Sequence, residues 1–275
     1  MSATLMDRDL DTTYTITPDH AAQFRRDGFI KLKNVLSPET LDYYGKEITR
    51  QVIRLNKQTK PMAERTTYEK AFLQIGNIWL QSEIAKEFVF SKKLARIAAE
   101  LMGVRGVRLY HDQALYKEPS GGLTPWHADQ YYWPLSNSNT CTVWVPFQYT
   151  PIAMGPLSFA VGSHRYEYGR DLVISDESET KLQRELAAQN FRYEESIFDL
   201  GEVSYHYGWT YHRAGPNSTT QSRSVMTIIY MDEDIRVAEP KNASQENDKK
   251  GLLPDTKPGD PAATHLNPVI WSSGQ

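Results

Sequence analysis

The chain has 275 residues, 40% of them hydrophobic, so it is long enough to bury a sizeable core in one large domain. Its 31 basic and 34 acidic residues leave a formal net charge of -3, and no block of Lys or Arg suits a nucleic acid backbone. The single cysteine, Cys141, excludes an intrachain disulfide and a multi-cysteine zinc site.

The chain shows no secretory signal pattern at its start and no run of about 20 apolar residues, which a membrane-spanning helix requires. We therefore expect a soluble, cytoplasmic protein that binds neither nucleic acid nor membrane. A monomer and a homodimer are both compatible with the sequence.

The N-terminal part, about 17–105, is predicted to be mainly helical. We expect a capped helix from Thr17 to Gly28, a half-buried strand over 29–35, a second helix opening at Ser37, and a third over 82–102.

From Gly106 the pattern changes to short β-type runs separated by Gly, Pro, Asn and Ser. No helices alternate with these runs, which argues against a parallel sheet. We predict a mainly β fold with α: a double-stranded β-helix, or jelly roll, over 106–235, with the N-terminal helices packed on it. A C-terminal extension, 236–275, carries no periodicity, and the whole chain, 1–275, is taken as a single domain.

A charged insert, 165–200, interrupts the series of strands. Nine acidic residues outnumber five basic ones there, and part of it is predicted to be helical. It is either a lid over a site or a solvated connector.

The strongest chemical signal is His127-Ala128-Asp129. In an extended stretch, residues i and i+2 point to the same face, so one imidazole and one carboxylate can meet on one ion. His212 is the best third ligand, because it stands where a β-type run enters a Gly/Pro/Asn turn. Two histidines and one carboxylate form the facial triad of non-haem iron(II) oxygenases.

Each part of this pattern has an alternative. An H-x-D tripeptide arises often by chance, and His206 competes with His212 as the third ligand. Arg223 stands eleven residues after His212, at the start of an apolar strand, where a buried guanidinium needs a carboxylate. That carboxylate is either a dicarboxylic cosubstrate or a protein acid.

The order of four motifs resembles the phytanoyl-CoA dioxygenase family of Fe(II)/2-oxoglutarate-dependent oxygenases. These motifs are H-x-D at 127–129, GPLSFAVGSH at 155–164, H-x-x-x-x-N at 212–217, and the arginine at 223. The resemblance runs from about Pro18, through DGFIKLKNVLSPE, to about Asp232.

The resemblance implies the cofactors Fe(II), 2-oxoglutarate and O2, and a role for each matching residue. His127, Asp129 and His212 would bind iron, and Arg223 would pair with the distal carboxylate of 2-oxoglutarate. The cosubstrate would also face Trp144, which is otherwise plain core, and Gln113, which is otherwise a surface strand residue. The implied enzyme is a dioxygenase that decarboxylates 2-oxoglutarate to succinate.

Departures from the family pattern bear on the reaction. Ala128 and Ala214 replace polar residues of the namesake enzyme, so an acyl-CoA substrate is not expected. Asp129 favours hydroxylation over halogenation, because halogenases of this class carry Gly or Ala there. We expect hydroxylation of an aliphatic C–H group. Ring closure, epimerisation or desaturation starts from the same hydrogen abstraction.

Aromatic residues crowd around the ligands and suggest a small-molecule substrate, a metabolite or natural product. Because neighbouring strand residues face opposite ways, about half of them are expected to be packing only. The candidates for the substrate pocket are Trp126, Tyr131, Trp133, Trp209, Tyr211 and His111.

Two other classes of protein fit the triad alone. A non-oxygenase, cupin-like metal protein has no use for the Arg223 cation, whereas a zinc hydrolase would turn over without O2.

Overall fold

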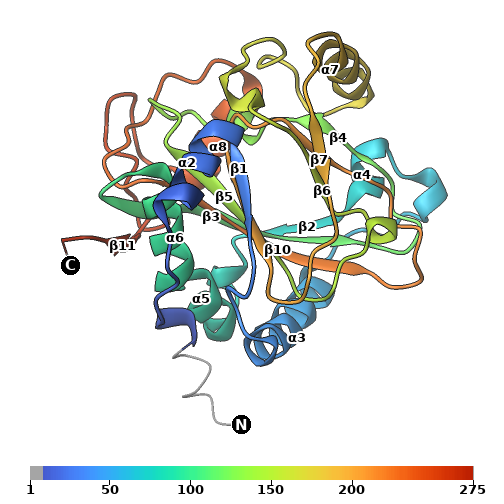
Figure 1. Ribbon diagram of the computed structural model, residues 1–275, viewed down its shortest axis with the longest axis horizontal. Helices are drawn as coiled ribbons and strands as arrows, with labels where there is room; N and C mark the ends of the chain where they lie inside the picture. The colour runs from blue at the N-terminus through green and yellow to red at the C-terminus, as the bar shows by residue number, and fades with distance from the viewer. Residues whose placement is uncertain (1–8, 275) are drawn as a thin grey trace.

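The computed structural model describes residues 9–274 and contains two antiparallel β-sheets (Figure 1). The larger sheet has the order β1 (Phe29–Leu32), β8 (Val203–Tyr207), β5 (Thr140–Pro146), β10 (Arg223–Asp232), β3 (Gly106–Lys117) and β11 (Val269–Ser272), and β2 (Leu73–Gly76) also pairs with β3. The smaller sheet has the order β4 (Thr124–His127), β9 (His212–Ala214), β6 (Leu157–Ala160) and β7 (Tyr193–Glu195). These two sheets and their helices confirm the predicted jelly-roll class.

Helices cover the outer face of the larger sheet, and Figure 1 shows α2, α5 and α6 together beside it. The N-terminal helices are α2 (Pro18–Asp27), α3 (Pro38–Leu55), α4 (Thr67–Ala71), α5 (Glu83–Val89) and α6 (Lys92–Met102). Two more, α7 (Asp176–Ala188) and α8 (Ala243–Leu252), follow. Short 3-10 helices are η1 (Met62–Glu64), η2 (Ile78–Leu80), η3 (Asp129–Tyr132), η4 (Ile152–Met154) and η5 (Ser163–Arg165).

Alternation along the strands of the larger sheet separates its two faces. On β5, Val143 and Val145 pack in the core beneath the helices, whereas Thr142 and Trp144 point to the space between the sheets. Successive strand residues point to opposite faces, so one strand serves both the core and the cavity.

Capping residues set the helix boundaries near the chain start. The Thr17 hydroxyl accepts from the backbone N–H of His20, and Gly28 ends α2 in the left-handed region, with φ 84°. The stretch 82–102, expected to be one helix, is two, because Ser91 caps α6 at a break after α5.

Among residues 9–274, no helix combines the length and the apolarity needed to cross a bilayer.

Two segments differ in detail from the expectation. The extended run that starts at Thr124 ends at His127, and Asp129 opens the 3-10 helix η3. The C-terminal extension, read as lacking periodicity, contains α8 and the edge strand β11. The helix was missed because α8 is polar nearly all round, with Gln245 its one buried residue.

We predict that Gly155→Ala destabilises the fold. Gly155 has φ 70°, and a Cβ there would be forced against the carbonyl oxygen of Gly215. The left-handed strain and the clash together cost about 2 kcal/mol, which urea unfolding would measure. Gly251→Ala in α8 is the control, because nothing lies within 4 Å of its added Cβ. Equal unfolding midpoints for the two variants would contradict the predicted strain and clash at Gly155.

Candidate active site

A cavity of about 570 Å³ lies between the two sheets. Its walls come from β3, β5, β8 and β10 of the larger sheet, from β4, β6 and β9 of the smaller sheet, and from α4 and α8. The three residues of the predicted triad all line it.

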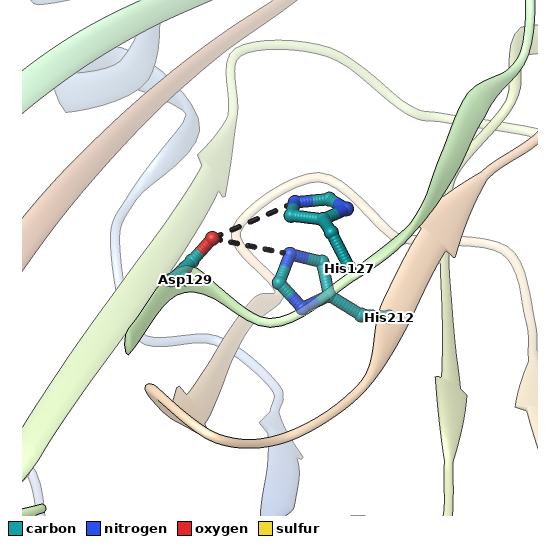
Figure 2. Close-up of side chains that lie close together, drawn as sticks. All are labelled: His127, Asp129 and His212. Atoms are coloured by element: carbon teal, nitrogen blue, oxygen red, sulfur yellow. Dashed lines mark ion pairs between the residues drawn. The ribbon is translucent and has the colours of Figure 1, made fainter. Parts of the chain in front are cut away.

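His127, Asp129 and His212 meet at one point of this cavity (Figure 2). The ligand atoms that they offer all lie within 4.8 Å of one another. Asp129 Oδ1 is 3.5 Å from His127 Nε2 and 3.6 Å from His212 Nε2. The two histidines are brought together by the pairing of β4 with β9, in which their Cα atoms are direct partners.

Backbone carbonyls hold both imidazole rings in the orientation that a metal requires. His127 Nδ1 is 2.7 Å from the carbonyl oxygen of Pro125, and His212 Nδ1 is 2.9 Å from that of Thr210. With a proton on each Nδ1, each Nε2 presents its lone pair to the shared point. This donor set therefore fits a divalent iron ion, with positions left open on the cavity side.

The second carboxylate oxygen of Asp129 is also held. The Thr142 hydroxyl donates to Oδ2 over 3.0 Å, and His206 Nε2 lies 3.2 Å from the same oxygen. The cluster of candidate metal ligands does not include His206. Thus His206, the competing third ligand, contacts the second carboxylate oxygen of Asp129 and is not part of the triad.

The protonation states suit a metal site. Burial would raise the pKa of Asp129, but the imidazoles of His212, His127 and His206 outweigh it and hold this pKa well below its usual range. Burial, together with the nearby His127, lowers the pKa of His212 well below its ordinary value. A carboxylate that binds a metal is ionised and an imidazole that binds one is neutral, and these shifts favour those forms for Asp129 and His212.

Arg223 is buried in the same cavity, and only 1% of it is exposed. One guanidinium nitrogen donates to the carbonyl oxygen of Gly155, while the Nε atom has no partner. No ion pair joins it to an acid in the part of the chain that the structure describes, and burial lowers its pKa to about 9. A buried guanidinium in this state is a ready binding site for a carboxylate.

Trp144 and Gln113 both line the cavity. The guanidinium carbon of Arg223 lies 5.3 Å from the centre of the Trp144 ring, so Trp144 flanks the cation. The Gln113 side chain accepts from Gln74 Nε2 over 2.8 Å. The expected neighbours of a cosubstrate are therefore on the wall that carries Arg223.

Lys117 is a second buried basic residue, and it lies opposite Arg223 on the neighbouring strand. Its Nζ donates to the carbonyl oxygen of Gly122 and, over 3.2 Å, to the Thr124 hydroxyl. Burial, reinforced by the charge of Arg223, lowers the pKa of Lys117 to about 6. The amine is therefore mainly neutral at pH 7, and Arg223 remains the fixed cation.

The aromatic candidates divide into two groups. Trp133 and His111 line the cavity. Trp126 and Tyr211 instead pack with Leu182 of α7 on the far side of the smaller sheet. Each directly precedes a triad histidine, and adjacent strand residues face opposite ways, so these two side chains must point away from the ligands.

Trp209 and Tyr131 also lie off the cavity wall. Trp209 packs at the edge of the α7 cluster, under the guanidinium of Arg170. The Tyr131 carbonyl accepts from Asn242 and Gln245 of α8. The expectation that these residues line a substrate pocket is corrected accordingly.

The lining residues that were not anticipated include Tyr68, Phe72, Tyr132 and Asp248. Tyr132 stands beside Trp133 in an aromatic run, and this run was the one sequence signal that could have indicated a lining residue. The others come from α4 and its end and from α8, far from the triad in sequence, and no local pattern marks them.

The jelly roll, the His-Asp-His cluster and the isolated guanidinium together define an Fe(II)- and 2-oxoglutarate-dependent dioxygenase. A sequence model of the phytanoyl-CoA dioxygenase (PhyH) family matches residues 24–225, and the chain belongs to this family. Its cofactors are accordingly iron and 2-oxoglutarate.

Relatives in sequence are distant. A probable alpha-ketoglutarate-dependent hypophosphite dioxygenase of Stutzerimonas stutzeri is 25% identical over 169 residues, 60% of this chain and 59% of the relative's length. A phytanoyl-CoA dioxygenase domain-containing protein 1 homolog of Dictyostelium discoideum is 21% identical over 260 residues, 80% of this chain and 92% of the relative.

Solved structures with the same fold include the non-heme alpha ketoglutarate dependent carbocyclase SnoK from nogalamycin biosynthesis. It is 21% identical, with a TM-score of 0.77 over 95% of this chain and 99% of SnoK. EctD from S. alaskensis, solved with 2-oxoglutarate and 5-hydroxyectoine, is 20% identical, with a TM-score of 0.68 over 86% of this chain and 84% of EctD.

We predict that Lys117 makes the stability of the ligand-free protein depend on pH. Its pKa is about 6 when folded and 10.5 in its ordinary state, so between these values unfolding takes up a proton. The unfolding free energy must then rise with pH, by at most about 1.4 kcal/mol per unit. Lys117→Met should remove this slope in urea titrations at about pH 7 and about pH 9. Parallel pH profiles for the variant and the original chain would contradict the buried, neutral amine.

Proposed function

We propose that this enzyme oxidises an aliphatic C–H group of a small metabolite or natural product, by hydroxylation, while 2-oxoglutarate is decarboxylated to succinate. The observation that carries the proposal is one cavity holding both the triad and a buried guanidinium that pairs with no acid among the described residues. A metal protein without a carboxylic cosubstrate would have no use for such a cation. The cupin-like alternative and the zinc hydrolase are therefore disfavoured.

In this proposal, His127, Asp129 and His212 hold Fe(II). Thr142 and His206 fix the second oxygen of Asp129, so that Oδ1 stays directed at the metal. Outer contacts of this kind orient ligands and raise metal affinity. When bound, iron and 2-oxoglutarate supply the oxidation of the C–H group by O2.

Arg223 would bind the distal carboxylate of 2-oxoglutarate through its free nitrogens. The Gly155 carbonyl fixes one side of the guanidinium, and Trp144 lies against it. The cation is thereby oriented before the cosubstrate arrives, which reduces the entropy lost on binding. The remaining chain positions the substrate and excludes water.

Hydroxylation is favoured because Asp129 keeps its carboxylate. The fold neighbours leave the related outcomes open for this chain, since SnoK is a carbocyclase and SnoN an epimerase. Product mass separates them: hydroxylation adds one oxygen atom, ring closure or desaturation removes two hydrogens, and epimerisation changes neither.

Three further predictions accompany the proposal. Residues 1–275 would act as a single oxygenase domain, with 165–200 as an insert and 236–275 as an extension. The protein would be cytoplasmic, and it would be a monomer or homodimer. The insert contributes Ile174 to the cavity wall, which supports a role as a lid.

The proposed function is tested by adding Fe(II) and 2-oxoglutarate without oxygen. The protein should develop the visible absorption band of an iron–2-oxoglutarate chelate. Admission of O2 should then release succinate, faster with a substrate than without it. Iron binding without the band, or succinate-free turnover without O2, would contradict the proposal.

Two variants should divide the roles within the site. Asp129→Ala removes a metal ligand and should weaken Fe(II) binding at least about 100-fold. Arg223→Ala should leave Fe(II) binding within about twofold, but weaken 2-oxoglutarate about 100-fold, because a buried charged hydrogen bond is lost. Calorimetric titration of each ligand separates the two effects.

The controls are Asp234→Ala and Arg105→Ala, which remove an exposed acid and an exposed base outside the cavity. Both should bind iron and 2-oxoglutarate like the original chain. Equal loss of iron in Asp129→Ala and Arg223→Ala would overturn this division of roles.

A further inference from the structure

We propose that the substrate carries a positively charged nitrogen, which is bound by Asp248 of α8 and by the aromatic wall beside it. This inference rests on the proposed function, because it assigns a substrate class to the same cavity. It is carried by the position of Asp248, by its lack of a cationic partner among the described residues, and by the charges of the other lining groups.

The position of Asp248 is fixed relative to the triad. Helix α8 supplies Asn247, Asp248, Gly251 and Leu252 to the cavity wall. The Gln245 side chain on the same helix donates to the carbonyl oxygen of Tyr131 over 3.0 Å. Tyr131 belongs to η3, which begins with Asp129. The helix is thus attached to the segment that presents the metal carboxylate.

Asp248 has no cationic partner among the residues that the structure describes. Its one polar contact is with the Tyr110 hydroxyl, at 3.5 Å, which is a weak hydrogen bond. Burial raises the pKa of Asp248 to about 7. A carboxylate in this state gains stability from any cation that enters the cavity, because the cation offsets the loss of hydration.

The charges of the loaded site leave Asp248 unbalanced. Fe(II) and Arg223 contribute three positive charges, and 2-oxoglutarate and Asp129 contribute three negative charges. The lining imidazole of His111 is neutral at pH 7, because burial lowers its pKa to about 4. Of the acidic lining residues, Asp248 remains, and it is the group that would offer a negative charge to a cationic substrate.

Aromatic rings line the same cavity as Asp248. Tyr68, Phe72, Tyr132 and Trp133 line the cavity. Burial raises the pKa of Tyr68 to about 12, and the charges of Asp129 and Asp248 add to this shift. The Tyr68 hydroxyl therefore interacts with both carboxylates. Aromatic faces attract cations, and the attraction grows when water is excluded. The rings and the carboxylate therefore favour the same chemistry, an ammonium group.

The matched family segment ends at residue 225, before α8 begins. The iron and cosubstrate residues lie inside that segment, whereas Asp248 lies beyond it. The C-terminal extension would thus supply substrate specificity to a site whose reaction is set by the matched segment.

The test uses two pairs of probes with nearly the same shape and different charge. Benzylamine, protonated at neutral pH, is paired with benzyl alcohol, and choline is paired with its uncharged carbon isostere. Binding is measured by calorimetry without oxygen, on protein loaded with Fe(II) and 2-oxoglutarate. At least one cation should bind at least about tenfold more tightly than its neutral partner.

Asp248→Asn should reduce that preference to less than about threefold, while the iron–2-oxoglutarate band stays unchanged. The matched control is Glu246→Gln, which removes an exposed acid from the same helix and should keep the preference. An unchanged preference in Asp248→Asn, equal binding within both pairs, or no saturable binding of either cation would overturn the inference. Loss of the band in the original chain would instead overturn the proposed function, and the probes would still report on Asp248.

Discussion

The site depends on the pairing of two short strands, β4 and β9. This pairing sets His127 directly opposite His212, and the turn into η3 adds the carboxylate of Asp129. Two backbone carbonyls then fix both rings with Nε2 turned inward. A shift of one residue in either strand would exchange a triad histidine for Trp126 or Tyr211 and destroy the metal site.

The cavity carries two charged groups of opposite sign on different elements, Arg223 on β10 and Asp248 on α8. Arg223 is held by a carbonyl and a tryptophan, and no acid of residues 9–274 pairs with it. Asp248 lies on a helix anchored to η3, and no base in that range pairs with it. Both are costly to bury unpaired. An anionic cosubstrate on one side and a cationic substrate on the other would relieve both costs.

The sequence was sufficient to predict the triad and the jelly roll, because short-range geometry carries them: H-x-D spacing, strand alternation and turn residues. It was misleading for Trp126 and Tyr211, since closeness to a ligand in sequence means the opposite face in a strand. Asp248 was out of reach, because α8 lacks an apolar stripe and meets the cavity through tertiary contacts with η3. Tyr68 could not be predicted either, because it lies on a five-residue helix that reaches the cavity only through the tertiary fold.

The most direct measurement is anomalous diffraction at the iron edge from crystals grown with Fe(II) and 2-oxoglutarate under nitrogen. The account requires an iron peak bonded to His127 Nε2, Asp129 and His212 Nε2, with the distal carboxylate of the cosubstrate against Arg223. An iron ion ligated by His206 in place of His212, or a cosubstrate carboxylate away from the guanidinium, would contradict it.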